Sequence, residues 1–240
     1  MIQIRSTGSG SLKKSQEEKK MNFADRLIES ILAQKSYLCV GLDPQIRYIP
    51  KHIREEAVIS CGGGGFEATT LAIFSYFRTI IDATAAYAAC YKPQAAFYEK
   101  YGSSGLSALE SINDYLHLLG FPVILDAKRE DGGDTSQAYA DTYLGNVEII
   151  DNNGGIVEIP SAMEVDAITI TPWIDTPNFD PFIKACELND KGIFIVDKTS
   201  FKPPSRLQEL VVEGSGGRRA WMVLAELAKE MGRDIKGEWG

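Results

Sequence analysis

The sequence is short of the side chains that most metal sites and cysteine-based active sites need. It has two histidines and four cysteines in 240 residues, and no two cysteines form a C-x-x-C pair. A zinc site or a Cys-His nucleophilic pair is therefore poorly supported. No apolar run approaches the ~20 residues that a membrane-spanning helix requires, so we expect no membrane partner. The sparse cysteines fit a reducing compartment, and we expect a cytoplasmic protein.

Positive charge is also scarce. Lys and Arg number 25 against 33 Asp and Glu, which gives a net charge of −8. Domains that bind nucleic acids usually carry a basic footprint, so we expect no nucleic-acid partner. An acidic protein can still bind an anionic substrate where its few cations converge. The hydrophobic fraction of 44% is ordinary for a globular chain, and the length suffices for one large α/β domain.

The first 20 residues differ in composition from the rest. Residues 6–11 are rich in Gly and Ser, and residues 13–20 mix both charges without apolar periodicity. The segment lacks the apolar core of a secretory signal. We therefore predict a disordered extension over residues 1–20 and a fold that begins at Met21.

From Met21 onward, short apolar runs alternate with segments of helical periodicity. The strand-like runs are residues 37–42, 87–92, 122–128, 167–171 and 192–196. The helical segments are residues 23–32, 66–86, 105–119, 135–144 and 179–188, with two more towards the C-terminus. This alternation predicts a parallel sheet covered by helices. Polar residues stand at the C-terminal ends of several strands, where a (β/α)₈ barrel places its active site.

Residues 126–131 are the most informative run in the chain. They read Asp-Ala-Lys-Arg-Glu-Asp and follow an apolar strand. Because side chains alternate along a strand, Asp126 and Lys128 are expected to share one face at its C-terminal end. Opposite charges this close hold each other ionised, and like charges repel. Taken alone, the run is most simply interpreted as a surface salt-bridge cluster.

Together with four other segments in the same order, the run resembles the D-x-K-x-x-D motif of the orotidine 5'-phosphate decarboxylase family, most closely its bacterial type 2 form. The other segments are residues 39–44, 91–99, 166–172 and 192–200. The resemblance extends from about Met21 to the C-terminus. It implies an α/β fold of the TIM (β/α)₈ barrel type. It also implies decarboxylation of orotidine 5'-phosphate to UMP, in de novo pyrimidine biosynthesis, with no metal or organic cofactor.

The resemblance implies a role for each charged residue. Removing CO₂ from a uracil-6-carboxylate leaves a carbanion with almost no resonance stabilisation, so an enzyme must stabilise the charge and deliver a proton. A lysine ammonium held by carboxylates can do both. Lys128 is implied to be this acid, while Asp126 holds it and crowds the substrate carboxylate. Lys92 is implied to orient Asp126 and the ribose.

Other residues are implied to bind the substrate or to act across a subunit interface. Asp43 would bind the ribose hydroxyls, and Ser200 would meet the pyrimidine. Asp131, a catalytic residue in the family, and Thr135 would enter the active site of a neighbouring subunit, which implies a homodimer with shared sites. The family usually has Ile after this second Asp. Gly132 stands there instead, without the side chain that would pack against the pyrimidine.

The number of strands is lower than the barrel requires. Eight βα units at this spacing would need on the order of 300 residues, against about 250 for a typical barrel. The family's main phosphate-binding segment, carried by strands six to eight, has no counterpart here. We therefore expect residues 21–240 to form a barrel domain incomplete at its C-terminus, with about five of the eight units and impaired activity. Two Gly-rich runs, residues 62–65 and 214–219, are interpreted as loops.

Two alternatives remain open. Mg²⁺-dependent sugar-phosphate decarboxylases and aldolases share this barrel, and Gly133 would satisfy their D-x-K-x-x-D-x-G motif. Asp43, Lys92 and Thr135, in their local contexts, favour the orotidylate group. The second alternative is an inactive truncated fragment that only associates through the barrel face.

Overall fold

The computed structural model describes residues 21–174, 176–232 and 237, and the extension predicted for residues 1–20 lies outside them. The fold begins with α1 (Phe23–Gln34), whose N-cap is Asn22. The Asn22 side chain accepts a hydrogen bond from the Asp25 backbone N–H at 2.9 Å, which satisfies one donor of the first turn. The helix ends at Lys35, which adopts a left-handed conformation with φ of 51°.

Five parallel strands form the centre of the molecule. They are β1 (Leu38–Leu42), β2 (Ala88–Pro93), β3 (Ile124–Arg129), β6 (Ala167–Ile170) and β7 (Gly192–Ile195). β1 pairs with β2, and β3, β6 and β7 form a second group in that order. Isolated bridges, Tyr91 with Val123 and Gln94 with Asp126, connect β2 to β3. All five predicted strands are present, so the parallel arrangement expected from the sequence is confirmed.

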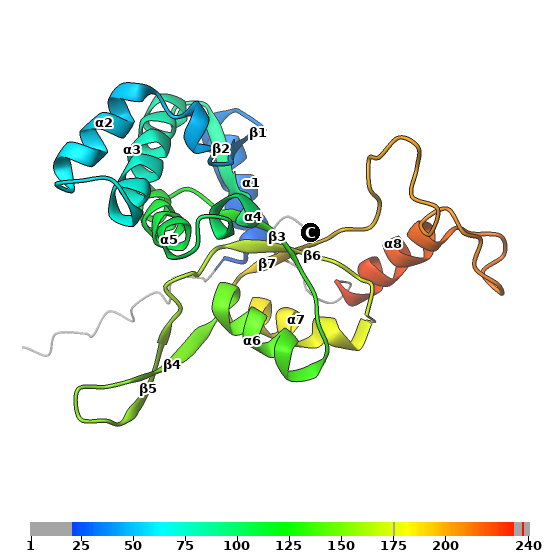
Figure 1. Ribbon diagram of the computed structural model, residues 1–240. Coiled ribbons are helices and arrows are strands. Elements are labelled where there is room, and N and C mark those ends of the chain that lie inside the picture. Colours follow the sequence, from blue (N-terminus) through cyan, green and yellow to red (C-terminus); the bar gives the residue numbers. More distant parts are fainter. Residues whose placement is uncertain (1–20, 175, 233–236, 238–240) are drawn as a thin grey trace, which may run out of the picture.

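Helices cover both sides of these strands (Figure 1). The helices after α1 are α2 (Lys51–Ser60), α3 (Phe66–Thr84), α4 (Ala95–Glu99), α5 (Ser103–Leu118), α6 (Gly133–Leu144), α7 (Asp180–Asn189) and α8 (Ala220–Met231), with 3₁₀ turns η1 (Ile46–Tyr48) and η2 (Thr176–Phe179). In Figure 1, α8 lies to one side of the strands. In Figure 1, α2, α3 and α5 lie on one side of the strands, and α6 and α7 lie on the other. The fully buried core side chains include Ile73 and Ile81 of α3, Leu109 and Ile112 of α5, and Leu125 of β3.

One expected helix near the C-terminus is absent from the described residues. Two helical segments were predicted there, but only α8 forms, and residues 206–209 make a turn. The chain cannot continue as a helix because Val211 forms an antiparallel bridge with Arg219. The Gly-rich residues 214–217 form the intervening turn, as expected of a loop. None of the helices in the described part of the chain is long and apolar enough to cross a membrane.

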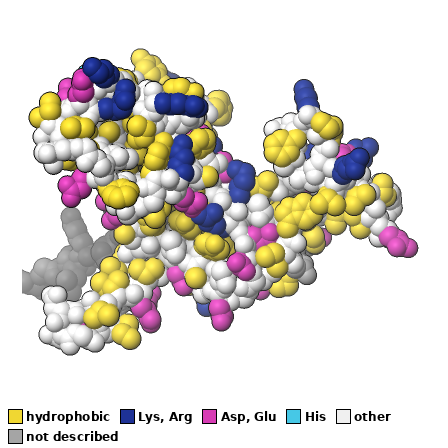
Figure 2. Space-filling view, in the orientation of Figure 1, with side chains coloured by type: hydrophobic (Ala, Val, Ile, Leu, Met, Phe, Trp, Pro, Cys, Tyr) yellow, Lys and Arg dark blue, Asp and Glu magenta, His cyan; other side chains and the backbone are white. Residues whose placement is uncertain are grey.

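A hairpin that the sequence analysis did not predict projects from the main body. β4 (Asn146–Ile150) and β5 (Ile156–Pro160) pair in antiparallel fashion, and Gly154 in the turn has a φ of 78°. The Asp151 carboxylate closes the turn by accepting hydrogen bonds from the Asn153 and Gly155 backbone N–H groups. Figure 2 shows hydrophobic side chains on the surface of this hairpin. The exposed ones are Ile149, Ile150, Ile156, Val157 and Ile159.

Candidate active site

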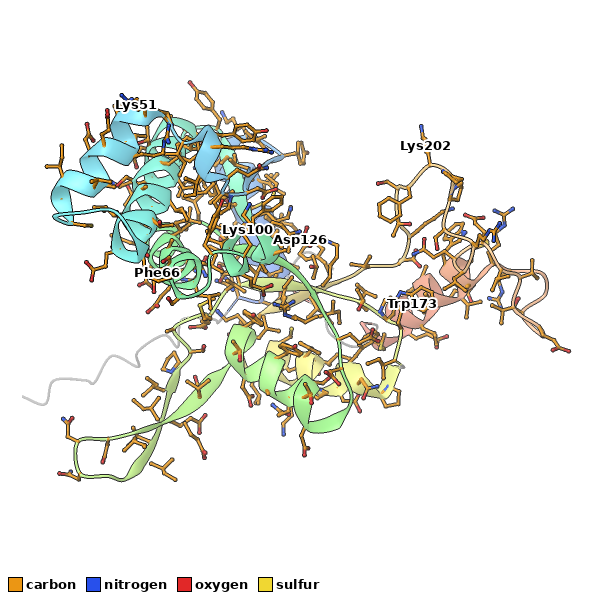
Figure 3. All side chains as sticks on the ribbon, in the orientation of Figure 1. Lys51, Phe66, Lys100, Asp126, Trp173 and Lys202 are labelled. Atoms are coloured by element: carbon orange, nitrogen blue, oxygen red, sulfur yellow. The ribbon has the colours of Figure 1, made fainter. Side chains whose placement is uncertain are left out.

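Asp126 lies at the centre of a small network of charges at the C-terminal ends of three strands. Its carboxylate accepts a hydrogen bond from Lys92 Nζ of β2 at 3.3 Å and one from Lys128 Nζ of β3 at 2.5 Å. The Thr169 hydroxyl of β6 donates to Asp126 Oδ1 at 2.9 Å. Figure 3 labels Asp126, which lies beside the strands near the middle of the molecule. Three of the predicted site residues therefore meet, and Thr169 joins them.

The backbone of β3 is irregular at this point. The register between β3 and β6 shifts between Leu125 and Arg129, so residues 126–128 stand opposite Thr169 alone. Lys128 has a φ of 50°, a left-handed conformation that is uncommon for residues other than glycine. Asp126 and Lys128 were expected to meet through simple strand alternation. They do meet, but across a bulge that turns the Lys128 backbone.

The electrostatic balance keeps Asp126 ionised. Burial alone would raise the pKa of its carboxyl group, but hydrogen bonds from Lys128 and Thr169 and the positive charges of Lys92 and Lys128 outweigh burial, and the pKa lies below its ordinary value. The Lys92 and Lys128 side chains are 36% and 48% exposed, whereas that of Asp126 is 16% exposed. The ammonium groups can therefore meet an anion that arrives from solvent.

The two predicted substrate-binding residues Asp43 and Ser200 are exposed, Asp43 just after β1 and Ser200 in the segment after β7. The Tyr98 hydroxyl is buried, and burial together with the nearby Asp43 charge raises the Tyr98 pKa well above its ordinary value. Within the described chain, no hydrogen bond joins Asp43 or Ser200 to the Asp126 network.

Asp131 and Thr135, predicted to act across a subunit interface, lie in the turn after β3 and in the first turn of α6. Asp131 Oδ1 accepts a hydrogen bond from the Gly132 backbone N–H at 2.7 Å, and the Asp131 carbonyl accepts one from the Ser136 hydroxyl at 2.6 Å. Thr135 is exposed. Neither side chain contacts Asp126 through a hydrogen bond in the part of the chain that the structure describes.

Residues next to the network hold the bulged strand in place. Arg129 forms an ion pair with Glu99 of α4, and its guanidinium lies 5.4 Å from the centre of the Tyr139 ring. The Glu130 carboxylate accepts a hydrogen bond from the Thr171 hydroxyl at 3.0 Å. The sequence analysis assigned no role to Arg129 or Glu130, although both lie inside the run of residues 126–131.

A second charged cluster occupies the opposite ends of the strands. Asp166 accepts hydrogen bonds from Arg26 Nη1 at 2.7 Å and from the Val123 backbone N–H at 2.9 Å, and His117 Nε2 lies 3.1 Å from its carboxylate. A cavity of about 690 Å³ lies beside this cluster. No group of three or more His, Cys, Asp or Glu side chains among the described residues is arranged to hold a metal ion.

Comparison with known proteins identifies the class of protein to which this fold and site correspond. Residues 36–234 match the protein family described as orotidine 5'-phosphate decarboxylase / HUMPS. The orotidine 5'-phosphate decarboxylase of Rhodopirellula baltica is 35% identical over 213 residues, which are 89% of this chain and 65% of the relative. That of Caldicellulosiruptor bescii is 32% identical over 226 residues, 92% of this chain and 69% of the relative.

A solved structure agrees with these relatives. The OMP decarboxylase of Leishmania donovani is 32% identical and superimposes with a TM-score of 0.63, over 87% of this chain and 65% of that one. The chain belongs to the orotidine 5'-phosphate decarboxylase / HUMPS family, as the sequence motifs implied. It spans about two thirds of the length of the relatives that it matches.

Proposed function

We propose that this chain decarboxylates orotidine 5'-phosphate to UMP, the reaction of de novo pyrimidine biosynthesis, and that it uses no metal or organic cofactor. The observation that carries the proposal is the Asp126 carboxylate held between Lys92 and Lys128. The chain's relatives are named orotidine 5'-phosphate decarboxylase, which agrees with it. The network lies at the C-terminal ends of parallel strands, where barrel enzymes of this type place their active sites. We infer that the chain is of the bacterial type 2 form and that residues 21–240 form a barrel domain with about five of the eight βα units.

The chemistry follows from the charges. The substrate carboxylate at C6 lies next to the Asp126 carboxylate, and repulsion between the two is relieved as the bond from C6 to CO₂ breaks. The electron pair that remains on C6 is stabilised by the Lys128 ammonium. Lys128 then donates a proton to C6, which forms the C–H bond of UMP. Because the Lys128 side chain is 48% exposed, solvent can return the proton.

The rest of the site comes from residues outside the network. Asp43 binds the ribose hydroxyls, Thr135 and Ser200 bind the nucleotide, and Lys92 orients Asp126. Asp131 and Thr135 of one subunit complete the site of the other in a homodimer. Neither side chain hydrogen-bonds to Asp126 within the described part of the chain, and Thr135 is exposed, and both observations support this arrangement. The four free cysteines support a cytoplasmic location.

The test is direct turnover by the purified 240-residue chain. Orotidine 5'-phosphate is supplied in D₂O, the loss of its absorbance is followed, and the UMP is examined by NMR. We expect UMP with one deuterium at C6, because the exchangeable Lys128 ammonium supplies the proton. Turnover should be unchanged by EDTA. Turnover that EDTA abolishes, with sugar phosphates as the better substrates, would instead identify the Mg²⁺-dependent relatives. No turnover of either substrate class would refute the proposal.

A further inference from the structure

Thr169 occupies the one position of β6 that faces the whole bulge of β3. Its hydroxyl accepts hydrogen bonds from the backbone N–H groups of Ala127 at 3.0 Å and Lys128 at 2.9 Å, and it donates to Asp126 Oδ1 at 2.9 Å. A hydroxyl has one donor and two acceptor sites. All three sites are used. The two backbone N–H groups can only donate and occupy the acceptor sites, and the ionised Asp126 carboxylate can only accept and takes the hydroxyl proton.

The bulge creates the need for this hydroxyl. In a regular parallel ladder, the N–H groups of neighbouring strand residues alternate between partners on the two sides. Here residues 126–128 face a single residue of β6, Thr169. The successive N–H groups of Ala127 and Lys128 therefore both point towards it. A backbone N–H that is removed from water and left without an acceptor destabilises the local structure. The Thr169 hydroxyl supplies the acceptor for both.

The same hydroxyl links the backbone turn to the charged groups. Lys128 holds a left-handed backbone conformation, with φ of 50°, which is unfavourable for a residue other than glycine and persists only where its surroundings fix it. That conformation returns the Lys128 side chain to Asp126, where Nζ lies 2.5 Å from Oδ1. Thr169 donates to the same oxygen. One atom therefore fixes both the lysine backbone and the carboxylate that the lysine contacts.

We propose that Thr169 is a positioning residue for the decarboxylation, which sets the relative placement of Asp126 and Lys128 through its hydroxyl. The inference rests on the proposed function. Thr169 takes no part in proton transfer itself. Because its effect is on the geometry of the reacting groups, its loss should lower kcat far more than it weakens binding of the nucleotide. A displacement on the order of 1 Å at such groups typically lowers the rate about 10²-fold.

The first experiment compares Thr169→Val, which removes the hydroxyl but keeps the shape, with Thr169→Ser, which keeps the hydroxyl. Thr79→Val is the matched control, because the Thr79 hydroxyl donates to Ser75 O of its own helix, 2.9 Å away on an exposed face, and to no other group among the residues that the structure describes. We expect kcat to fall about 10²-fold in Thr169→Val and to stay within about fivefold of the parent chain in Thr169→Ser and Thr79→Val. The affinity for UMP should change less than about threefold in all three.

The pH profile adds a readout that a merely structural role would leave unchanged. The Thr169 hydrogen bond is one of the contributions that lower the Asp126 pKa. Its removal should raise that pKa, so the acid limb of the kcat/KM profile should move to higher pH in Thr169→Val and not in Thr169→Ser. A Thr169→Val chain that unfolds at lower temperature but keeps its kcat and acid limb would overturn the proposal, as would Thr169→Ser with the same defect as Thr169→Val.

Amide hydrogen exchange separates this inference from the proposed function. Measured by NMR without substrate, exchange at Ala127 and Lys128 should be at least about tenfold faster in Thr169→Val than in the parent chain, and unchanged in Thr169→Ser. If the parent chain shows no turnover, the proposed function fails, and this measurement alone decides whether Thr169 positions the two groups. Equal exchange in Thr169→Val and the parent chain overturns the positioning role, whatever the activity.

Discussion

Two aspartates, one at each end of the strands, hold positively charged or protonatable side chains in different ways: Asp166 lies near Arg26, His117 and Lys191, and Asp126 near Lys92 and Lys128. Asp166, at the beginning of β6, is 5% exposed and also accepts a hydrogen bond from the Val123 backbone N–H. Its partner Arg26 donates to Asp190 O as well, so the guanidinium is bound on two sides. Asp126 is more exposed, and its lysine partners each keep a large exposed surface. Arg26 and His117, the partners of Asp166, are 34% and 35% exposed, against 36% for Lys92 and 48% for Lys128. The first aspartate is the more deeply buried of the two, and Lys128 is the most exposed of these partners.

The comparison indicates which features set the proposed reactive network apart from a structural ion pair. Both carboxyl groups have lowered pKa values. At Asp166, burial raises the pKa, but the hydrogen bond to His117, the charge of Arg26 and the Val123 N–H outweigh it strongly. Ion-pair chemistry alone therefore does not identify the site. The greater exposure of Lys128 and its strained backbone do, because unused ammonium donors and a fixed geometry are what a substrate anion requires.

The largest effect is expected at Lys128, the proposed proton donor of the Asp126 network. In Lys128→Ala, kcat should fall about 10³-fold or more, because the lysine acts mainly on charge that exists in the transition state. UMP affinity should change only a few-fold, and Tm should stay within about 2 °C. Lys51→Ala is the control, since Lys51 lies on α2, far from Asp126 in Figure 3, and its one ion pair within the described part of the chain is with Glu55 of the same helix. A Lys128→Ala chain with more than about a tenth of the parent kcat would contradict its role.

The next effect concerns the second subunit. Asp126→Asn and Asp131→Asn chains should each be inactive, and mixing them should restore activity, because each heterodimer contains one site with both aspartates. With equal amounts and random exchange, about a quarter of the sites are restored, since half of the dimers are mixed and each has one complete site. Mass spectrometry confirms the exchange. Exchanged chains that stay inactive would show that the sites are not shared.

A third prediction tests the enclosed aspartate. Asp166→Asn should lower the free energy of unfolding by about 2 kcal/mol, because a hydrogen-bonded charge is lost beside Arg26. Activity per folded molecule should be retained, and Asp126→Asn should show the reverse pattern. Urea titrations and turnover assays of both variants measure the contrast. Equal losses of stability in the two variants would mean that exposure does not distinguish these sites.

The Asp166 carboxyl group should also make the stability of the fold depend on pH in the acid range. The folded-state pKa of Asp166 is lower than its unfolded value, so its contribution is fully present above about pH 4 and is lost as the pH falls from there towards the folded-state pKa. The free energy of unfolding should be measured from pH 6 downwards. Below about pH 4 it should fall less steeply in Asp166→Asn than in the parent chain. Parallel curves would contradict this assignment.

The sequence predicted the five parallel strands because each is a short apolar run between helical segments, although β1 is largely exposed and β7 only half-buried. It predicted the meeting of Lys92, Asp126 and Lys128 from their places at strand ends. It did not predict the β4–β5 hairpin, whose two faces are both exposed and so give no inside-outside alternation. The helix α2 was also missed, since Ala57 is its one buried residue and the apolar periodicity is weak.

Thr169 could not be predicted, because its role depends on the shift in register between β3 and β6, which no local pattern encodes. A polar residue inside a buried apolar strand is the one signal that could have drawn attention to it. The roles of Asp43, Asp131, Thr135 and Ser200 stay predictions, because they concern a substrate and a second subunit.

The smallest expected effect concerns the two glycines after Asp131. Gly132 has an extended conformation, with φ of −89° and ψ of 146°, and a Cβ there would meet nothing within 4 Å. Gly133 has a φ of 48°, which strains any other residue. Gly132→Ile should therefore fold normally and lower the KM for orotidine 5'-phosphate by a few-fold, as the added side chain packs on the pyrimidine of the partner subunit's site. Gly133→Ala should instead lower stability by about 1 kcal/mol. Gly132→Ile with an unchanged KM in a confirmed dimer would mean that this position does not face the neighbouring site.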